Sequence, residues 1–331
     1  MFITRQAFIM PIIQLSKCTD NHFGCHVGNT PMVKLSSKTN AHSQKGINIY
    51  VKLEYCNPTG SIKDRMVQYI LEDAIKAGKI QPDGTVIEAS SGNTGTSLSM
   101  FCKRYGLKSI IFTNTKCSDE KINKMKMYGA TVHVNDDYKN VALKQAKEHP
   151  EWFHLNQYDN CKNAQSYYDT YGPEIWDDMQ GQLNYFVAGG GTDGTIFGTG
   201  SFLKYKNKDI KIILADVSGS ITLIEGVSSM RSINYADVID DVLKIQDQEA
   251  LDMCHVLAKN ETIFAGGSGG FNVVASLNLA ELLAKNDNLN ENHAINIITV
   301  IPDSGLKYMS KIYNPVWLQD NNIDVTSFFK F

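Results

Sequence analysis

The stretch N-P-T-G-S-I-K-D-R, residues 57–65, places Lys63 directly after a Pro/Gly turn and at the start of an expected helix. A strand-like run, N-I-Y-V-K-L-E-Y, precedes the turn. The first turn of a helix carries partial positive charge, so a lysine there is mildly disfavoured. Lys63 is therefore either an incidental surface residue or a functional residue whose chemistry needs an ammonium of lowered pKa.

On both sides of this stretch, short apolar runs alternate with amphipathic segments. Strands are expected at 48–55, 85–89, 108–113, 131–134, 184–188, 210–215 and 295–300. Helices are expected near 62–78, 94–105, 118–128, 138–148, 164–178, 195–206, 247–259, 270–285 and 305–311. Continuous apolar strands that alternate with helices predict an α/β fold, with mostly parallel sheets and helices on both faces. In such folds, ligands bind in the loops at the carboxyl ends of strands.

Length and charge narrow the class of protein. A chain of 331 residues exceeds what one hydrophobic core usually supports, so two lobes are expected. The formal net charge is −3, and no basic run dominates, which argues against a nucleic-acid or membrane surface. No apolar stretch approaches the roughly 20 residues that cross a bilayer. Residues 1–11 do not resemble a secretory signal. They are expected to form an N-terminal arm, and the expected location is the cytoplasm.

The seven cysteines are scattered and odd in number, which fits reduced thiols better than a disulfide framework. Cysteine and histidine occur together in C-T-D-N-H-F-G-C-H, residues 18–26. Metal sites usually need closer pairs such as C-x2-C, so a local turn is favoured here and no metal is expected.

Four loops that follow expected strands carry unusual residues. S-S-G-N-T-G-T (90–96) offers hydroxyl and backbone N–H groups that suit an anion, although the same residues could simply cap a helix. G-G-G-T-D-G-T (189–195) is not a Walker loop and fits one phosphate group. For A-G-G-S-G-G (265–270), close helix–sheet packing explains the glycines at least as well as contact with a ligand does. The last loop, 299–310, places Ser304 between a strand end and a new helix.

Together these loops and Lys63 supply an amine, a phosphate cradle, a carboxylate-sized anion site and a hydroxyl. A phosphorylated aldehyde bound as an imine to lysine needs this set, and the cofactor with that chemistry is pyridoxal 5′-phosphate (PLP). Lysine forms such an imine when burial or neighbouring positive charge lowers its pKa. The partial positive charge at the helix start is expected to contribute to a lowered pKa of Lys63.

The chain resembles the cysteine synthase and cystathionine β-synthase family, which are fold type II PLP enzymes. The similarity runs from V-G-N-T-P-M-V-K-L (27–35) to P-D-S-G-L-K-Y-M-S (302–310) and includes Y-G-P-E-I-W (171–176) between the loops quoted above. The resemblance implies a two-domain, tryptophan synthase β-like fold. Its larger, phosphate-binding domain would comprise 12–55 and 160–331, and its smaller, mobile, substrate-binding domain 56–159. It also implies a homodimer.

The same resemblance assigns roles to residues. Lys63 is expected to carry the internal aldimine and then to act as acid and base at the substrate Cα. Asn93 is expected to bond the ring hydroxyl, and Ser304 the pyridine nitrogen. The residues expected to bind the substrate carboxylate are Ser90, Ser91, Asn93, Thr94 and Gln157. Those expected to bind the cofactor phosphate are Gly191, Thr192, Gly194 and Thr195.

The implied reaction is β-replacement on serine or an O-activated serine through an α-aminoacrylate, which gives cysteine, cystathionine or a related β-substituted alanine. One alternative is an amine nucleophile that acts with O-phosphoserine, as in the synthesis of siderophore precursors. Another is β-elimination from cysteine with release of sulfide. A regulatory protein that kept the fold and lost the chemistry is disfavoured, because Lys63 and Asn93 are both present.

Some positions depart from the common cysteine synthase pattern. Ser90 replaces a usual Thr, and Asp193 replaces a usual Gly in the phosphate loop, where a carboxylate would repel phosphate. The pair Gln157-Tyr158 and the segment 215–220 look more like cystathionine β-synthases. The spacing of Cys18 and His26 does not match the haem-binding extension of those enzymes, so haem is not expected. Their regulatory domain pair is not expected either.

Overall fold

The computed structural model describes residues 26–219, 222–228, 237–285 and 294–324. The expected N-terminal arm, with Cys18 and Cys25, lies outside the described residues. The five described cysteines, Cys56, Cys102, Cys117, Cys161 and Cys254, are free thiols.

Ten strands and ten α-helices are defined in the described ranges. The strands are β1 (Met32–Lys34), β2 (Ile47–Leu53), β3 (Thr85–Ala89), β4 (Lys108–Thr113), β5 (Thr131–Val134), β6 (Phe153–His154), β7 (Tyr185–Gly189), β8 (Lys211–Val217), β9 (Asp241–Ile245) and β10 (Ile295–Ile301). The helices are α1 (Lys63–Lys76), α2 (Asn93–Arg104), α3 (Asp119–Met127), α4 (Tyr138–Glu148), α5 (Lys162–Ser166), α6 (Gly172–Asp178), α7 (Gly194–Lys206), α8 (Asp247–Glu261), α9 (Gly267–Ala284) and α10 (Pro315–Asp320). Short helical turns are η1 (Ala41–Lys45), η2 (Glu54–Cys56), η3 (Tyr167–Tyr171) and η5 (Gly305–Tyr308).

The strands form two sheets. The larger sheet has the order β1-β2-β10-β7-β8-β9, and the smaller has the order β5-β4-β3-β6. All paired strands are parallel except β1, which is antiparallel to β2. This confirms the predicted α/β class. The strands of the smaller sheet all lie within 56–159, the range expected for the smaller domain, and the mobility of that unit stays a prediction.

Every strand expected from the sequence is present, and the bounds of β3, β4, β5 and α4 match the expected ranges. The sequence patterns missed β1, β6, β9 and α10. The first two are too short to show a periodicity, and β9 is an edge strand that is mostly exposed and so lacks a continuous apolar run. The single helix expected over 164–178 is α5, the π-helical turn η3 and α6 in succession.

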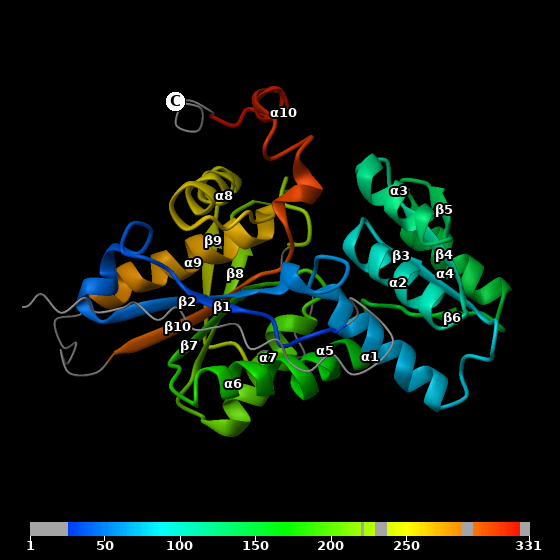
Figure 1. The fold of residues 1–331 in the computed structure, drawn as a ribbon, viewed down its shortest axis with the longest axis horizontal. Coiled ribbons are helices and arrows are strands. Elements are labelled where there is room, and N and C mark those ends of the chain that lie inside the picture. The colour runs from blue at the N-terminus through cyan, green and yellow to red at the C-terminus, as the bar shows by residue number, and fades with distance from the viewer. Residues whose placement is uncertain (1–25, 220–221, 229–236, 286–293, 325–331) are drawn as a thin grey trace, which may run out of the picture.

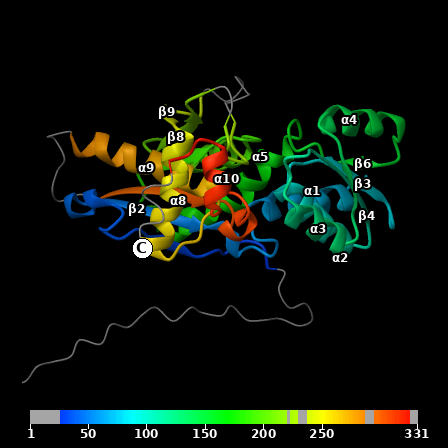
Figure 2. The same cartoon turned by 90° about the horizontal axis from the view of Figure 1, so that it is seen from above.

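Helices cover both faces of each sheet (Figure 1). In the larger unit, α8 and α9 lie on one face and α6 and α7 on the other. In the smaller unit, α2 and α3 pack on one face and α4 on the other. Figure 2 shows the smaller sheet with α4 at the end of the molecule opposite α9. One apolar core joins the units, because Val86 and Leu98 belong to the same buried cluster as Phe186.

A buried ion network anchors the beginning of α1. The Arg65 guanidinium bonds both oxygens of Glu54 at 2.7 and 2.8 Å, and its third nitrogen bonds Glu174 at 2.8 Å. Lys52, at 2.7 Å from Glu174, adds a second buried cation. These side chains come from the end of β2, from η2, from α1 and from α6. The network therefore fixes the position of Lys63, which lies two residues before Arg65.

Replacement of Arg65 by methionine is expected to lower the free energy of unfolding by about 3–5 kcal/mol, because it leaves the buried Glu54 without its cation and removes one of the two cations that pair with Glu174. Urea unfolding followed by circular dichroism measures the change. The control is Arg104→Met at the exposed end of α2, which is expected to stay within about 0.5 kcal/mol of the parent. Equal stabilities for the two variants would contradict the anchoring role.

Candidate active site

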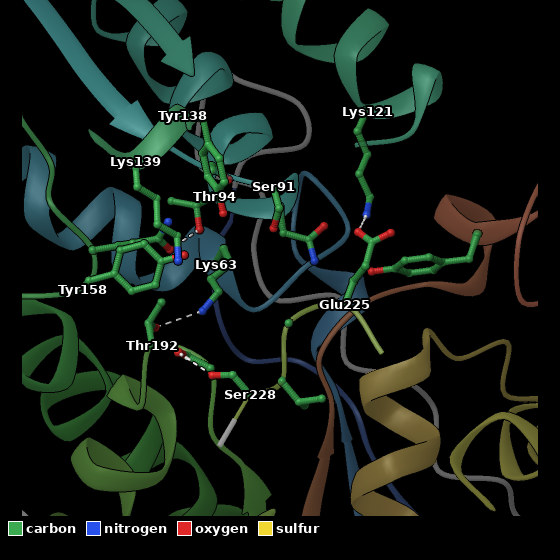
Figure 3. Close-up of a pocket in the computed structure, with 17 residues that line it drawn as sticks. Lys63, Ser91, Thr94, Lys121, Tyr138, Lys139, Tyr158, Thr192, Glu225 and Ser228 are labelled. Atoms are coloured by element: carbon green, nitrogen blue, oxygen red, sulfur yellow. Dashed lines mark hydrogen bonds and ion pairs between the residues drawn. The ribbon is translucent and has the colours of Figure 1, made fainter. Parts of the chain in front are cut away.

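Two cavities share Lys63 as a lining residue, and both are lined by residues of the two units. Figure 3 shows the residues that line the outer one. The outer cavity has a volume of about 190 Å³ and is lined by Ser91, Tyr158 and Ser228, among others. The inner cavity is about 50 Å³, and its lining includes Thr195 and Ser268. Both lie where loops leave the carboxyl ends of parallel strands, as the α/β pattern predicted.

Lys63 is the first residue of α1. Its Nζ lies 3.3 Å from Thr192 Oγ1, and burial of the ammonium lowers the pKa of Lys63 to about 8. The neighbouring charges, Asp193 and Asp303, are negative and act in the opposite direction. The pKa of Lys63 is therefore lowered, as the sequence predicts. The main cause is burial, and not positive charge near a helix start.

The loop 90–96 is held by hydrogen bonds between its own residues. Ser90 Oγ accepts hydrogen bonds from the backbone N–H groups of Gly92 and Gly95, at 3.1 and 2.9 Å. The Ser90 hydroxyl thus holds the loop in shape, as a helix cap would. Ser91, Asn93 and Thr94 line the outer cavity with it. The structure therefore brings together the hydroxyl and amide groups that the sequence predicted for an anion.

Gln157 supports this loop from the turn that follows β6. Its Oε1 accepts a 2.7 Å hydrogen bond from Thr94 Oγ1, and its Nε2 donates to the Ala89 carbonyl at 3.0 Å. Behind it lies Glu88, whose pKa burial raises to about 8. Gln157 lines the outer cavity, but the hydrogen bonds of its side chain go to the protein.

The loop 191–195 forms a cradle at the beginning of α7. A Cβ on Gly194 would lie 2.0 Å from Asn163 Oδ1, and a Cβ on Gly191 would lie 2.2 Å from the Gly226 carbonyl. Only glycine fits at these two positions. Thr192 Oγ1 receives a second hydrogen bond, from Asn163 Nδ2 at 3.0 Å. The loop leads into the N-terminus of α7, where backbone N–H groups can bind an anion.

Asp193 is the unusual member of this loop. It has a left-handed backbone conformation (φ 63°), and one carboxylate oxygen would lie 2.6 Å from a Cβ built on Gly190. The carboxylate is thus folded back toward Gly190, and it is nearly buried. Its charge acts on Lys63, whose pKa it raises against the effect of burial.

These residues fit PLP. An amine that is partly neutral near pH 8 lies within hydrogen-bond distance of the Thr192 hydroxyl, in the glycine-rich loop that leads into α7, and this pair suits an aldehyde and a phosphate on one small molecule. Asn93 lines both cavities beside Lys63, as the ring of such a molecule would require.

Ser304 does not line either cavity. Its Oγ accepts a hydrogen bond from Leu306 N at 3.2 Å and caps η5. It lines another cavity of about 740 Å³, which we call the large cavity. Ser268, in the first turn of α9, lines the inner cavity instead. The position of Ser304 therefore does not support the expected contact with a pyridine nitrogen. The better-placed hydroxyl is that of Ser268, in the A-G-G-S-G-G segment.

Sequence reasoning missed several residues of the outer cavity. Lys121 of α3 forms a 2.5 Å ion pair with Glu225, which also pairs with Lys311 at 2.6 Å. Lys139 lies over the ring of Tyr158, 4.5 Å from its centroid. These pairs join segments that are far apart in the sequence, so no local pattern indicates them.

The described ranges contain no group of three or more His, Cys, Asp or Glu that could hold a metal ion. His26, part of the 18–26 segment, is exposed and lies 2.8 Å from the Asn29 amide. Among the described helices, none is long and apolar enough to cross a membrane.

Comparisons with known proteins agree with this site. A family model described as pyridoxal-phosphate dependent enzyme matches residues 25–293. The O-acetylserine dependent cystathionine beta-synthase of Bacillus subtilis is 35% identical over 86% of this chain and 94% of that protein. The cysteine synthase of Dictyostelium discoideum is 31% identical over 91% of this chain and 86% of that protein.

A solved structure of an O-ureido-L-serine synthase superposes with a TM-score of 0.79 at 28% identity, and covers 88% of this chain and 94% of that one. The predicted fold type, cofactor and enzymatic class are confirmed by these matches together. The chain belongs to the pyridoxal-phosphate-dependent enzyme family that includes cysteine synthases and cystathionine β-synthases.

Proposed function

We propose that this enzyme catalyses β-replacement on an O-activated serine, with a thiol as nucleophile, and so makes cysteine or a related β-substituted alanine. The observation that carries the proposal is the position of Lys63 between two cavities of different character. The inner one is lined by Gly191, Thr192 and Thr195 of the glycine-rich loop, which would hold a phosphate. The outer one is walled by the hydroxyl loop 90–94, which suits the carboxylate of an amino acid.

The cofactor would be held by side chains and loops already described. Gly191, Thr192, Gly194 and Thr195 would bind the phosphate at the beginning of α7. Asn93 would bond the ring hydroxyl, and Ser268, in place of Ser304, would meet the ring nitrogen. When bound, PLP supplies an electron sink that makes the Cα hydrogen of the substrate acidic.

A serine beside the ring nitrogen has a chemical consequence. Its hydroxyl, unlike a carboxylate, does not keep that nitrogen protonated, so the withdrawal of electrons by the ring is moderate. Moderate withdrawal favours the loss of a β-leaving group over complete carbanion chemistry. This is the reaction type proposed here.

The protein residues would then act as follows. Ser91 and Thr94 would bind the substrate carboxylate, and Ser90 and Gln157 would keep the loop in shape. Lys63 would remove the proton from Cα and return it after the nucleophile has added at Cβ. Its lowered pKa suits both roles, because an acid–base group works best with a pKa near the working pH.

The leaving group and the nucleophile are the finer part of the proposal. The name of the Bacillus subtilis relative includes O-acetylserine, which supports acetate as leaving group. An amine nucleophile with O-phosphoserine, and release of sulfide from cysteine, are the alternatives that the test must separate. We also propose that the enzyme works as a homodimer in the cytoplasm.

The reaction is tested by mixing PLP-loaded protein separately with O-acetylserine, O-phosphoserine, serine and cysteine and recording the absorption spectrum. We expect O-acetylserine to change the cofactor spectrum fastest, and sulfide or homocysteine then to restore it with release of the β-substituted product, identified by mass. Faster release of sulfide from cysteine would favour the lyase alternative. A protein that keeps no cofactor absorption after unbound PLP has been removed would support the regulatory alternative.

The pH dependence of cofactor attachment follows from the pKa of Lys63, about 8 against an ordinary 10.5. Only the neutral amine attacks the aldehyde, so the rate of attachment is expected to rise with pH and to level off just above pH 8. For an ordinary lysine the rise would continue to about pH 10. Stopped-flow absorbance at several pH values measures it, and Lys63→Ala, which should stay folded, controls for attachment elsewhere. A plateau only above pH 10 would show that burial does not weaken this ammonium.

The position of the ring nitrogen is tested with two serine variants. Ser268→Ala is expected to lower kcat/KM about tenfold and to alter the cofactor absorption maximum, because it removes a hydrogen bond to the ring. Ser304→Ala, which removes only the cap of η5, is expected to leave the spectrum unchanged. The reverse result would return the ring contact to Ser304.

A further inference from the structure

The side chain of Asn93 is held from two sides. Its Oδ1 accepts a 2.7 Å hydrogen bond from Lys307 Nζ, and its Nδ2 donates to Asp303 Oδ2 at 2.7 Å. The same carboxylate oxygen accepts a 2.6 Å hydrogen bond from the Tyr308 hydroxyl. Asp303 is fully buried and Tyr308 nearly so.

This arrangement fixes the orientation of the amide. An ammonium can only donate and a carboxylate can only accept, so the amide oxygen must face Lys307 and the nitrogen must face Asp303. A flipped amide would place two donors together on one side and two acceptors on the other. Asn93 therefore presents one defined edge to the cavities that it lines.

Lys307 reaches the amide from outside the catalytic site. It lines the large cavity, whereas Asn93 lines the inner and outer cavities. Burial lowers the pKa of Lys307 to about 8, so the ammonium form predominates at neutral pH. The charged groups that act on it are Asp303, Lys121, Lys124 and Asp64.

We infer that Lys307 is a positioning residue for Asn93: it holds the amide oxygen from the large cavity, so that the nitrogen, which donates one N–H to Asp303, directs its second N–H to the ring oxygen of PLP. This inference rests on the proposed role of Asn93 in binding that oxygen. A hydrogen bond from a charged donor also polarises the amide, which makes its N–H groups stronger donors. The ionised form of the ring hydroxyl is thereby favoured.

The test uses Lys307→Met, which keeps the unbranched apolar part of the side chain without its charge, and Lys307→Arg, which keeps the charge. The matched control is Lys124→Met, because Lys124 lines the same cavity but donates to the Thr59 carbonyl at 3.1 Å. We measure the spectrum of bound PLP and its apparent Kd by titration. Thermal unfolding of the PLP-free forms monitors the fold.

Lys307→Met is expected to shift absorbance from the visible band of the ring-ionised cofactor to the near-ultraviolet band of the neutral form. Its Kd is expected to rise about tenfold, the effect of one charge-assisted hydrogen bond. Lys307→Arg should keep the visible band of the parent. Lys124→Met should have the spectrum and Kd of the parent. In an Asn93→Ala background, Lys307→Met should add no further change, because it acts through that amide.

The inference is overturned if Lys307→Met leaves the spectrum and Kd as in the parent, or if Lys124→Met changes them equally. It also fails if Lys307→Arg behaves like Lys307→Met, or if Lys307→Met has its full effect without Asn93. In each of these results the parent protein still binds PLP, so the proposed function stands. A parent protein that does not bind PLP would overturn both.

Discussion

The fork of hydrogen bonds between Arg65 and Glu54 is the constraint on which the catalytic geometry depends. It ties the first turn of α1 to the end of β2, and Glu174 extends the tie to α6. Lys63 leaves the same turn toward the cavities. Arginine suits this place because its planar group bonds two carboxylates at once and stays charged when buried. A single buried cation thus links the larger sheet to the amine.

Around that amine, burial and charge act against each other. Desolvation weakens the Lys63 ammonium, while Asp193 and Asp303 partly restore it. Asp303 also accepts hydrogen bonds from Asn93 and Tyr308, so it contributes both to the field at Lys63 and to the orientation of the amide. The polar groups of the site are therefore connected. Removal of the Asp303 carboxylate would change both the pKa of Lys63 and the orientation of the Asn93 amide.

Much of the fold and several loops of the site could be predicted from the sequence, because buried parallel strands and glycine-rich loops leave local sequence patterns. The loops around Lys63, Asn93 and Thr192 were found because each follows an apolar strand. The role of Ser304 was predicted in the same way, but a strand end does not reveal whether a hydroxyl turns inward or caps the next helical turn. Contacts such as that of Lys307 with Asn93, 214 positions apart, depend on tertiary structure and leave no local pattern.

The buried Glu88 beneath the loop 90–96 has a consequence for the ligand above it. Burial raises the pKa of this carboxyl to about 8, so its protonated form predominates at neutral pH. It can thus hold the Gln157 amide in place without directing negative charge at an incoming amino acid. The acidic residue beneath the loop therefore adds little negative charge to the cavity that the loop lines.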